Sequence, residues 1–507
     1  MKRWIALLCA LIFINTTPAL AQSSTTLPPV VSRYAVPVGD TLTEIAQTVQ
    51  LSLPSAFNGQ LMLVPERMLL EPFRHPAEAV VRKLLSYTGS EQAQPLWPEG
   101  TLQLNTGSRV EISGDVATVD LSANALMLDV RSLHTVSRAI ANTLTQLGDI
   151  RYVNILVAGQ QQGVDTAATF PVGSFRQTSN EDALARWENV SAQAGLDAQS
   201  QRRFSAIATL YFPVAAGRGV AAEARALTFA GQSREQMAVT LIQALEQGAQ
   251  TLPGVPRIVE LSSLLSQVPQ LTTLPGTGEK VMDLHFLDIF NEKLIEAGIP
   301  RSVMMASLAL TLTTFIPGIA GVRAYIGAEA VTAVVPAGTY EGSGTSILFE
   351  DGIMRRAQFS PFLLTHVALY FANGNGTLTE TKRPVPFRHA RNARYLLAQL
   401  MEGPHAADSV QGLHACLPQG LNDAVIVGVS QVNDAIVVNF SGALLDGAKD
   451  LPPTQERQLV YGIINTLTSL PGVKRVSLFI EGQQPETLSG SLFLPGEFLR
   501  NPEIIGH

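Results

Sequence analysis

Three residues that could bind a metal lie close together in the last quarter of the sequence. His405, His414 and Cys416 form the tightest group among the eight histidines and two cysteines of the chain. A metal site needs several His, Cys or carboxylate ligands on one face. These three residues flank a Leu-Pro turn, and an equivalent turn at residues 92–97 carries no such ligands. We therefore interpret them as a solvated loop with a chance thiol, and the sequence predicts no metal and no cofactor.

The sequence offers no recognisable catalytic constellation. It lacks the Gly-x-Ser-x-Gly elbow of serine hydrolases and the P-loop of nucleotide-binding proteins. The stretch Gly342-Ser343-Gly344-Thr345-Ser346 has the composition of a flexible linker. Asp120, Asp283 and Asn439 share one position of a repeated pattern described below, and a catalytic carboxylate is not expected to alternate with asparagine. We predict no catalytic residue, and assign these three side chains to capping or turn bonds at strand ends.

Arg388, His389, Arg391 and Arg394 form a short basic cluster. Such a cluster can meet an anionic partner, for example teichoic acid or a phospholipid head group. The solvated face of a helix is the more common role of such a cluster. Both alternatives stay open, and the sequence identifies no partner-binding residue.

Length and composition indicate a multidomain globular protein. At 507 residues the chain suggests about three domains. Its apolar fraction of 46% and aromatic fraction of 6% are ordinary for folded protein. The formal charge of −7 comes from 35 basic and 42 acidic residues. This balance argues against a nucleic-acid groove, which needs clustered Lys and Arg.

The N-terminal residues have the layout of a secretory signal peptide. Lys2 and Arg3 are followed by an apolar run at residues 4–14, and Ala19-Leu20-Ala21 is a small-x-small cleavage site. We predict a signal peptide at residues 1–21 with cleavage after Ala21, the alternative being an uncleaved anchor. Either way the bulk of the chain is expected outside the cytoplasm. Cys9 lies inside the apolar run, which disfavours a lipid anchor and leaves one cysteine in the mature chain.

One pattern occurs three times along the chain. Each copy opens with an alternating strand and a helix, and later has a Thr-Leu-Thr helix, a Gly or Pro-Gly stop and a strand that ends at glycine. The later parts span residues 143–159, 311–327 and 466–482. The opening strands are predicted at 49–53, 208–212 and 367–371, and the helices after them near 75–87, 233–247 and 389–402.

Residues 303–322 are almost all apolar and long enough to cross a membrane. The repeat aligns Thr311 and Pro317-Gly318 with the helix and stop of the other copies, and Pro-Gly would interrupt a membrane span. We therefore predict a buried core helix followed by a strand.

A shorter echo, Phe-x-x-Gly followed by an arginine, comes after each copy. We predict extended connectors with tight turns, which pack on their own copy or bridge to the next. A linker helix is expected at residues 179–201, with Trp187 packed on a neighbouring copy. The echoes occupy 170–173, 349–352 and 493–496, with Arg176, Arg355 and Arg500 after them.

The order of these elements resembles the GerM domain of sporulation and spore-germination proteins. Module 3 (residues 363–483) carries the resemblance best, with Leu-Met-Glu-Gly-Pro at 400–404 and Leu-Pro-Gly-Val-Lys-Arg-Val at 470–476. Module 1 (34–159) is close, whereas module 2 (203–328) lacks the Leu-Pro-x-Gly turn. The implied fold class is α+β, with three tandem GerM-like modules, each a small mixed sheet covered by two helices. Short extended connectors at 160–202 and 329–362 join them, and 484–507 is a C-terminal extension.

The resemblance implies an exported, non-enzymatic cell-envelope protein that binds or scaffolds partners in sporulation, germination or envelope assembly. The partners it implies are envelope or sporulation proteins. Peptidoglycan is a further candidate, nucleic acid is not expected, and self-association is left open.

Two alternatives come from other classes. Gly39-Asp40-Thr41-Leu42 and Ile45-Ala46 look like the opening of a peptidoglycan-binding LysM motif, and residues 59–65 look like its end. Burial of Leu42 and Ile45 in module 1 would exclude that alternative. An envelope hydrolase with a site gathered from separate modules is the other, and a carboxylate or histidine pair converging in a pocket would favour it.

Overall fold

The computed structural model describes residues 35–41, 43–162, 173–181, 203–214, 218–231, 233–336 and 344–506. The predicted signal peptide and the stretch around Trp187 lie outside these residues. In the described part of the chain, no helix combines the length and apolar character needed to cross a membrane. From Val36 onward the chain forms one compact unit.

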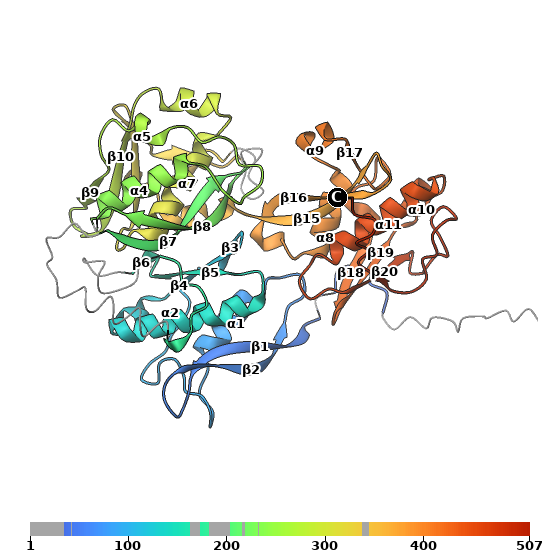
Figure 1. Ribbon diagram of the computed structural model, residues 1–507, viewed down its shortest axis with the longest axis horizontal. Coiled ribbons are helices and arrows are strands. Elements are labelled where there is room, and N and C mark those ends of the chain that lie inside the picture. The colour runs from blue at the N-terminus through green and yellow to red at the C-terminus, as the bar shows by residue number, and fades with distance from the viewer. Residues whose placement is uncertain are drawn as a thin grey trace, which may run out of the picture. The chain divides into compact units, whose positions relative to one another are not determined.

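Module 1 contains a hairpin, two α-helices and a four-stranded sheet (Figure 1). Its elements are β1 (Ile45–Pro54), β2 (Leu61–Leu70), α1 (Ala77–Leu85), β3 (Glu111–Ser113), β4 (Val116–Leu121), η1 (Ala123–Met127), α2 (Val130–Leu144), η2 (Thr145–Leu147), β5 (Tyr152–Val157) and β6 (Gln160–Gln161). In the sheet order β3-β4-β5-β6, the central pair is parallel and the outer pairs are antiparallel. Helix α2 contacts both β1 and β5 and so joins the hairpin to the sheet.

Module 2 repeats this arrangement. Its elements are β7 (Phe204–Pro213), β8 (Val220–Phe229), α4 (Arg234–Glu246), α5 (Leu261–Leu264), β9 (Gln270–Thr273), β10 (Lys280–Phe286), α6 (Phe290–Glu296), α7 (Arg301–Phe315), β11 (Gly321–Ile326) and β12 (Glu329–Ala330). The sheet order is β9-β10-β11-β12, again with a parallel central pair. The connector after it contains β13 (Ala333–Val334), β14 (Ile347–Leu348), η4 (Glu350–Gly352) and η5 (Arg356–Phe362).

Module 3 has the same order of hairpin, helix, sheet strands, long helix and final strands. Its elements are β15 (Leu363–Asn373), β16 (Leu378–Pro386), η6 (Phe387–His389), α8 (Ala393–Glu402), α9 (Ala406–Val410), β17 (Leu413–His414), η7 (Asp423–Val425), β18 (Ile426–Val432), β19 (Ala435–Phe440), α10 (Gly442–Ala448), α11 (Pro453–Leu467), β20 (Arg475–Ile480) and β21 (Phe498–Leu499). The sheet order is β18-β19-β20-β21, with β19 and β20 parallel. The predicted α+β fold, with its three tandem modules built on small mixed sheets, is therefore confirmed.

A buried threonine makes the same hydrogen bond in all three modules. The first threonine of each Thr-Leu-Thr motif is fully buried, and its hydroxyl oxygen accepts a backbone N–H of the opening strand. The bond satisfies a buried amide that would otherwise lack a partner. It joins Ser52 to Thr143 at 2.8 Å, Tyr211 to Thr311 at 3.0 Å and Tyr370 to Thr466 at 3.3 Å.

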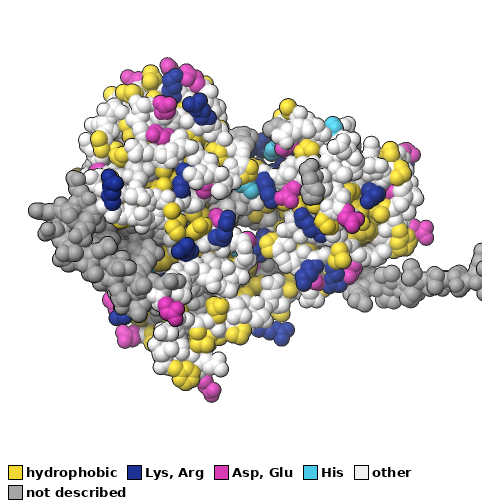
Figure 2. Space-filling view, viewed as in Figure 1, with side chains coloured by type: hydrophobic (Ala, Val, Ile, Leu, Met, Phe, Trp, Pro, Cys, Tyr) yellow, Lys and Arg dark blue, Asp and Glu magenta, His cyan; other side chains and the backbone are white. Residues whose placement is uncertain are grey.

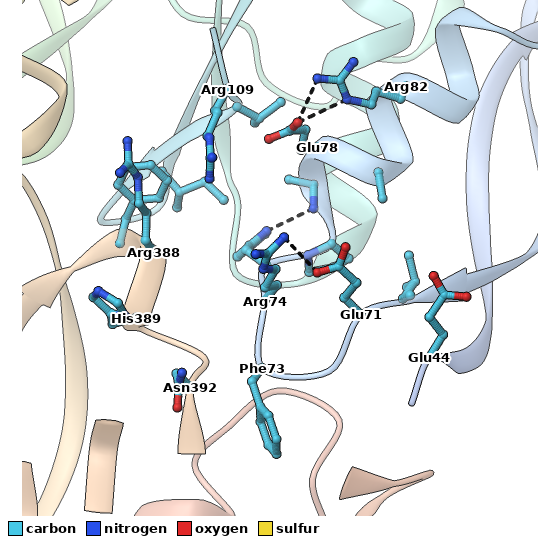
Figure 3. Close-up of a pocket in the computed structure, with 18 of the residues that line it drawn as sticks. Glu44, Glu71, Phe73, Arg74, Glu78, Arg82, Arg109, Arg388, His389 and Asn392 are labelled. Carbon is cyan, nitrogen blue, oxygen red and sulfur yellow. Dashed lines mark hydrogen bonds and ion pairs between the residues drawn. The ribbon is translucent and has the colours of Figure 1, made fainter. Parts of the chain in front are cut away.

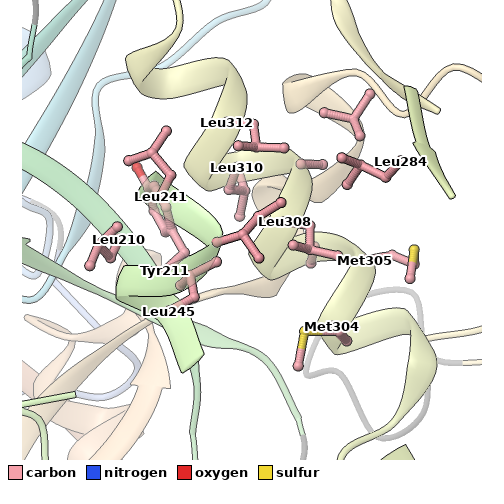
Figure 4. Close-up of a cluster of buried hydrophobic side chains, with 14 of the residues drawn as sticks. Leu210, Tyr211, Leu241, Leu245, Leu284, Met304, Met305, Leu308, Leu310 and Leu312 are labelled. Carbon is pink, nitrogen blue, oxygen red and sulfur yellow. The ribbon is translucent and has the colours of Figure 1, made fainter. Parts of the chain in front are cut away.

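The apolar segment of module 2 is a core helix, as predicted. Every residue of α7 after Arg301 is buried, and the helix ends before Ile316, whose backbone is extended. Figure 4 shows its Leu and Met side chains packed against Leu210 and Tyr211 of β7 and against leucines of α4 and β10. A helix that is apolar on all sides is stable in water only when it is surrounded in this way.

Modules 2 and 3 share one sheet. Strand β8 pairs in parallel with β15 at Val220–Leu363 and Ala221–Leu364, which gives the order β16-β15-β8-β7. Ser113 of module 1 completes this junction, since its hydroxyl donates to the Leu364 carbonyl at 2.5 Å and accepts the Ala222 N–H at 2.9 Å. The modules are therefore joined directly, in addition to the predicted connectors.

Each connector packs back on its own module, and the first also bridges to the next one, since the Ser174 N–H donates to the Ile207 carbonyl of β7 at 2.8 Å. Both predicted alternatives therefore occur. In each module, a residue just after the Phe-x-x-Gly echo pairs with the strand that follows the long helix, namely β5, β11 or β20. The pairs are Phe175–Val153, Met354–Val322 and Phe498–Val476. These pairs correct the predicted alignment of arginines. Arg356, not Arg355, corresponds to Arg500, because both follow the bridging residue by two positions.

The corresponding arginines cover corresponding tyrosines. Arg356 lies over the Tyr211 ring and Arg500 over the Tyr370 ring, at 5.4 and 5.0 Å from the ring centres. Module 1 has Ser52 at the tyrosine position. Arginine–tyrosine stacking therefore ties the connector to the hairpin in modules 2 and 3.

The predicted C-terminal extension is part of module 3. Leu488, Leu494 and Ile504 belong to its hydrophobic core. The Leu378 N–H donates to the Ile504 carbonyl at 2.7 Å, and the Gly506 N–H donates back to Leu378 at 2.8 Å. Module 3 thus needs these residues to complete its core.

Residues 37–41 lie on module 3, although the sequence assigns them to module 1. The Gly39 and Thr41 N–H groups donate to carbonyls of β18 at 2.9 and 3.0 Å. Ile45, in contrast, is buried within β1. Leu42 lies outside the described residues. The expected burial is thus met at Ile45, and the division of the opening residues between two modules argues against the LysM alternative.

Candidate functional site

The three potential metal ligands of module 3 do not converge. Cys416 is buried, its thiol donates to the Tyr370 carbonyl at 3.3 Å, and burial raises its pKa to about 12. The expectation of a solvated loop is wrong at this residue, because the Cys416 side chain packs against Gly462 in the core. His414 is exposed on β17. Across the described ranges, no three His, Cys, Asp or Glu side chains are placed to hold a metal.

Two of the three aligned polar residues form the predicted turn bonds. Asp120 accepts the Gly159 N–H at 2.8 Å, and Asn439 accepts the Gly482 N–H at 3.0 Å. Asp283 instead binds the Arg323 guanidinium through two bonds of 2.8 Å. The alignment of Asp283 is wrong by two residues, as shown by the strand registers Asp120–Leu156, Asn439–Phe479 and His285–Tyr325.

The basic cluster of module 3 is used mainly within the chain. Arg391 binds Asp149 at 2.5 Å, and Arg394 binds Asp40 at 2.9 Å. Neither the anionic-partner nor the solvated-face alternative describes these two residues, which attach other parts of the chain to module 3. Arg388 and His389, however, line a cleft.

This cleft lies between modules 1 and 3 and has a volume of about 820 Å³ (Figure 3). Module 1 contributes the end of β2, the start of α1 and the loop before β3, and module 3 contributes residues 387–389 and Asn392. The volume is in the range of small-molecule and peptide-side-chain sites. It is the candidate functional site. The sequence pointed to only two of its residues, Arg388 and His389 of the basic cluster, because its walls are far apart in the chain.

The lining combines cationic, anionic and aromatic groups. Arg74 pairs with Glu71 and Arg82 pairs with Glu78, both at 2.8 Å. On the opposite side, Figure 3 shows Arg109 beside Arg388, with His389 below them. Phe73 and Phe387 also line the cleft. This mixture suits a polar ligand with an acidic group, since guanidinium groups form paired hydrogen bonds to carboxylate or phosphate.

His75 forms one wall of the cleft and contacts both modules. Its Nδ1 accepts the Ala77 N–H at 3.1 Å, which leaves Nε2–H to donate to Asp149 at 3.0 Å. Burial lowers the pKa of His75, and the neighbouring Arg391 lowers it further, against the opposing effect of Asp149. Burial raises the pKa of Asp149, but His75 and Arg391 outweigh it and hold this pKa well below its usual range.

A carboxylate or histidine pair converging in a pocket was the feature expected to favour a hydrolase, and the related contact here joins His75, which lines the cleft, to Asp149, which does not. Here both ring nitrogens of His75 are already bonded, to Ala77 and Asp149, and Asp149 is also bound by Arg391. A general base needs one ring nitrogen available to the proton of a nucleophile. The geometry therefore gives this pair of module 1 a structural role, and the bond from Arg391 of module 3 to Asp149 makes the tie between the two modules.

Acidification should weaken this tie. Because the folded-state pKa of His75 is depressed, the unfolded chain binds the proton more readily, and stability present above about pH 6.5 is lost below it. We expect the free energy of unfolding to fall from about pH 7.5 to about pH 5.5 more steeply in the wild type than in His75→Gln. His414→Gln, at an exposed histidine, should keep the wild-type slope. Equal slopes for wild type and His75→Gln, measured by urea denaturation, would contradict this assignment.

The visible surface carries no continuous basic band. Figure 2 shows Lys and Arg side chains scattered over this face among Asp and Glu. A nucleic-acid groove needs clustered cations. The viewed face thus lacks that pattern.

The architecture and cleft can now be set beside known families. A family model named Germane, described as sporulation and spore germination, matches residues 54–163 and 368–486. These segments span most of modules 1 and 3. Modules 1 and 3 belong to the Germane family. Module 2 lies between the matched segments and shares the strand order and buried threonine bond of the two Germane modules.

Three solved structures are similar to parts of this chain. The tandem GerMN domains of the sporulation protein GerM from Bacillus subtilis match at 16% identity over 59% of this chain and 99% of that one, with a TM-score of 0.22. The first GerMN domain alone gives 18% identity, 27% and 98% coverage, and a TM-score of 0.23. A Clostridium perfringens protein described as a lipoprotein gives 19% identity, 27% and 87% coverage, and a TM-score of 0.19. No curated protein matches the chain.

Proposed function

We propose that this protein is an exported, non-enzymatic factor of the cell envelope that binds or scaffolds partners in sporulation, germination or envelope assembly. The proposal is supported by the Germane family of modules 1 and 3, whose description is sporulation and spore germination. It places a polar segment of an envelope or sporulation protein in the cleft between these modules. The observation that carries the placement is the cleft itself, which two modules build together.

Three properties of the cleft favour binding over catalysis. Its histidine–carboxylate pair is fully bonded within the protein. Its guanidinium groups can bind an acidic group. Its lining places Glu71 and Glu78 beside Arg74 and Arg82, so that it offers groups of both charges to a polar segment.

Removing two arginines from the cleft should reduce partner binding. We expect Arg109→Ala with Arg388→Ala to lower recovery of crosslinked partners by about tenfold, which corresponds to ~1.4 kcal/mol. Both side chains lie at the cleft rather than in the core, so folding should be retained. The measurement is affinity capture of the tagged chain from its own host, in vegetative and in sporulating cells.

Arg131→Ala is the matched control, because Arg131 is exposed on α2 and does not line the cleft. It should leave recovery unchanged. Equal recovery with the cleft variant would reject the cleft as the binding site. Retention of the wild-type chain on purified cell wall, with no protein captured, would instead favour peptidoglycan as the partner.

A further inference from the structure

The N-terminal arm (residues 36–41) extends the sheet of module 3. The Gly39 N–H donates to the Val427 carbonyl at 2.9 Å, and the Thr41 N–H donates to the Val429 carbonyl at 3.0 Å. Thr41 forms a parallel bridge with Ser430. The arm thus occupies the outer edge of β18, which would otherwise present unpaired backbone groups.

The edge is shaped for this arm. A Cβ at Gly428 would lie only 2.6 Å from the carbonyl oxygens of Pro37 and Gly39, so only glycine admits the arm there. Asp40 is held on both oxygens by the Arg394 guanidinium, at 2.9 Å each. Asp40 also accepts the Val429 N–H at 3.2 Å. Backbone pairing, a close approach at glycine and a clamped carboxylate are the components of strand-addition recognition.

The corresponding edges of the other modules differ. In module 1, two separate segments pair with the outer side of β4, namely residues 103–105 and β3. In module 2, residues 264–266 and β9 pair with β10 in the same way. Strand β18 is continuous from Ile426 to Val432 apart from one bulge. Only module 3, among the described residues, therefore offers an uninterrupted edge with an arm on it.

The arm is held more weakly than the sheet that it covers. Two ladder bonds, the bond from the Asn439 amide to the Pro37 carbonyl at 3.1 Å and the contacts of Asp40 fix it, while Val38 is 88% exposed and the Asp40–Arg394 ion pair is about 30% exposed on each side. Partly exposed ion pairs contribute little to stability, and chain segments with few buried contacts open first. Opening would expose a built edge without disturbing the cores of the three modules.

We propose that the β18 edge is a binding site for the N-terminal arm of a second copy of this chain. In the structure, the arm of the same chain occupies this edge and shows what the site binds. It binds an extended segment in which a glycine is followed by an aspartate. Exchange replaces the same bonds between copies and so costs little, as in other swapped segments. The inference is independent of the cleft and of its ligand.

Complementation between two variants tests the exchange. Asp40→Ala with Thr41→Pro damages the arm and leaves the edge intact, because proline cannot donate to Val429. Gly428→Val blocks the edge and leaves the arm intact. Each full-length variant should be monomeric alone in size-exclusion chromatography with light scattering, and the equimolar mixture should give a dimer.

Arg394→Ala provides a second edge variant in case Gly428→Val misfolds, as judged by its circular dichroism and melting temperature. It should also form a dimer with the arm variant. A chain that carries both the arm and the edge changes should form a dimer with neither partner. Mixtures that contain only monomers, or dimers of equal amount in every sample, would overturn the proposal.

Discussion

Replacing Arg356 with alanine is expected to cost about 3–5 kcal/mol of folding free energy, because it leaves a carboxylate without its buried partner. Arg356 is only 6% exposed and joins three parts of the chain. Its guanidinium donates to Glu111 of module 1 at 2.5 Å, to Thr314 of α7 at 2.5 Å and to the Tyr211 hydroxyl at 3.2 Å. Burial alone would lower the pKa of Arg356, but Tyr211 and Glu111 outweigh it and raise this pKa, so the side chain stays charged.

Chemical denaturation would measure the effect. Arg500→Ala is the matched control, since Arg500 covers Tyr370 in the same way but is 38% exposed, and a smaller loss is expected there. Arg356→Met combined with Glu111→Gln removes both charges and should recover much of the stability. A single alanine variant as stable as the wild type would show that the three contacts contribute nothing net.

Glu456→Ala is expected to release the C-terminal segment of module 3 and to cost about 3–4 kcal/mol, because buried amides lose a charged acceptor. The Glu456 side chain is fully buried on α11. Its two oxygens accept the backbone N–H groups of Leu488, Ser489, Ser491 and Leu492 at 2.8–3.1 Å. No other described carboxylate accepts four backbone amides in this way.

Hydrogen exchange would locate the release. The amides of residues 488–492 and of β21 should lose protection in Glu456→Ala, whereas α7 should keep it. Glu486→Ala, at an exposed glutamate of the same segment, is the control and should leave exchange unchanged. Protection at 488–492 equal to that of the wild type would show that the carboxylate is dispensable.

The same site predicts a pH dependence in acid. Burial raises the pKa of Glu456, but the amide donors outweigh it and the pKa is lowered. A depressed carboxyl pKa contributes stability above its unfolded value near pH 4.5, and this stability is lost as the pH falls. The wild type should therefore lose stability below about pH 4.5 by more than Glu456→Ala does.

The repeat was predictable because its signals are local. Alternating apolar residues, the Thr-Leu-Thr motif and glycine stops recur in one order, and the strands at 49–53, 208–212 and 367–371 all fall inside β1, β7 and β15. The alignment of Asp283 failed for a geometric reason. A shift of two residues leaves each side chain on the same face of a strand, so the pattern alone cannot detect it.

The cleft and the arm were not predictable in the same way. The lining runs from Glu44 to Asn392, and no local pattern links such distant residues. Gly39-Asp40-Thr41 matched a short motif, whereas its structural role depends on a strand nearly four hundred residues later. One usable signal was Gly428, since glycine inside a strand often marks the close approach of another backbone.

Both ends of the described chain are fastened to module 3, the arm at β18 and residues 504–506 at the start of β16. Tension applied between the two ends would therefore pass through module 3 alone. Modules 1 and 2 would carry no load as long as both ends stay attached to module 3. The arm, with its two ladder bonds, would peel first, and only then would the load reach the other modules. Under mechanical tension the protein would thus unfold in two stages, of which detachment of the arm is the first.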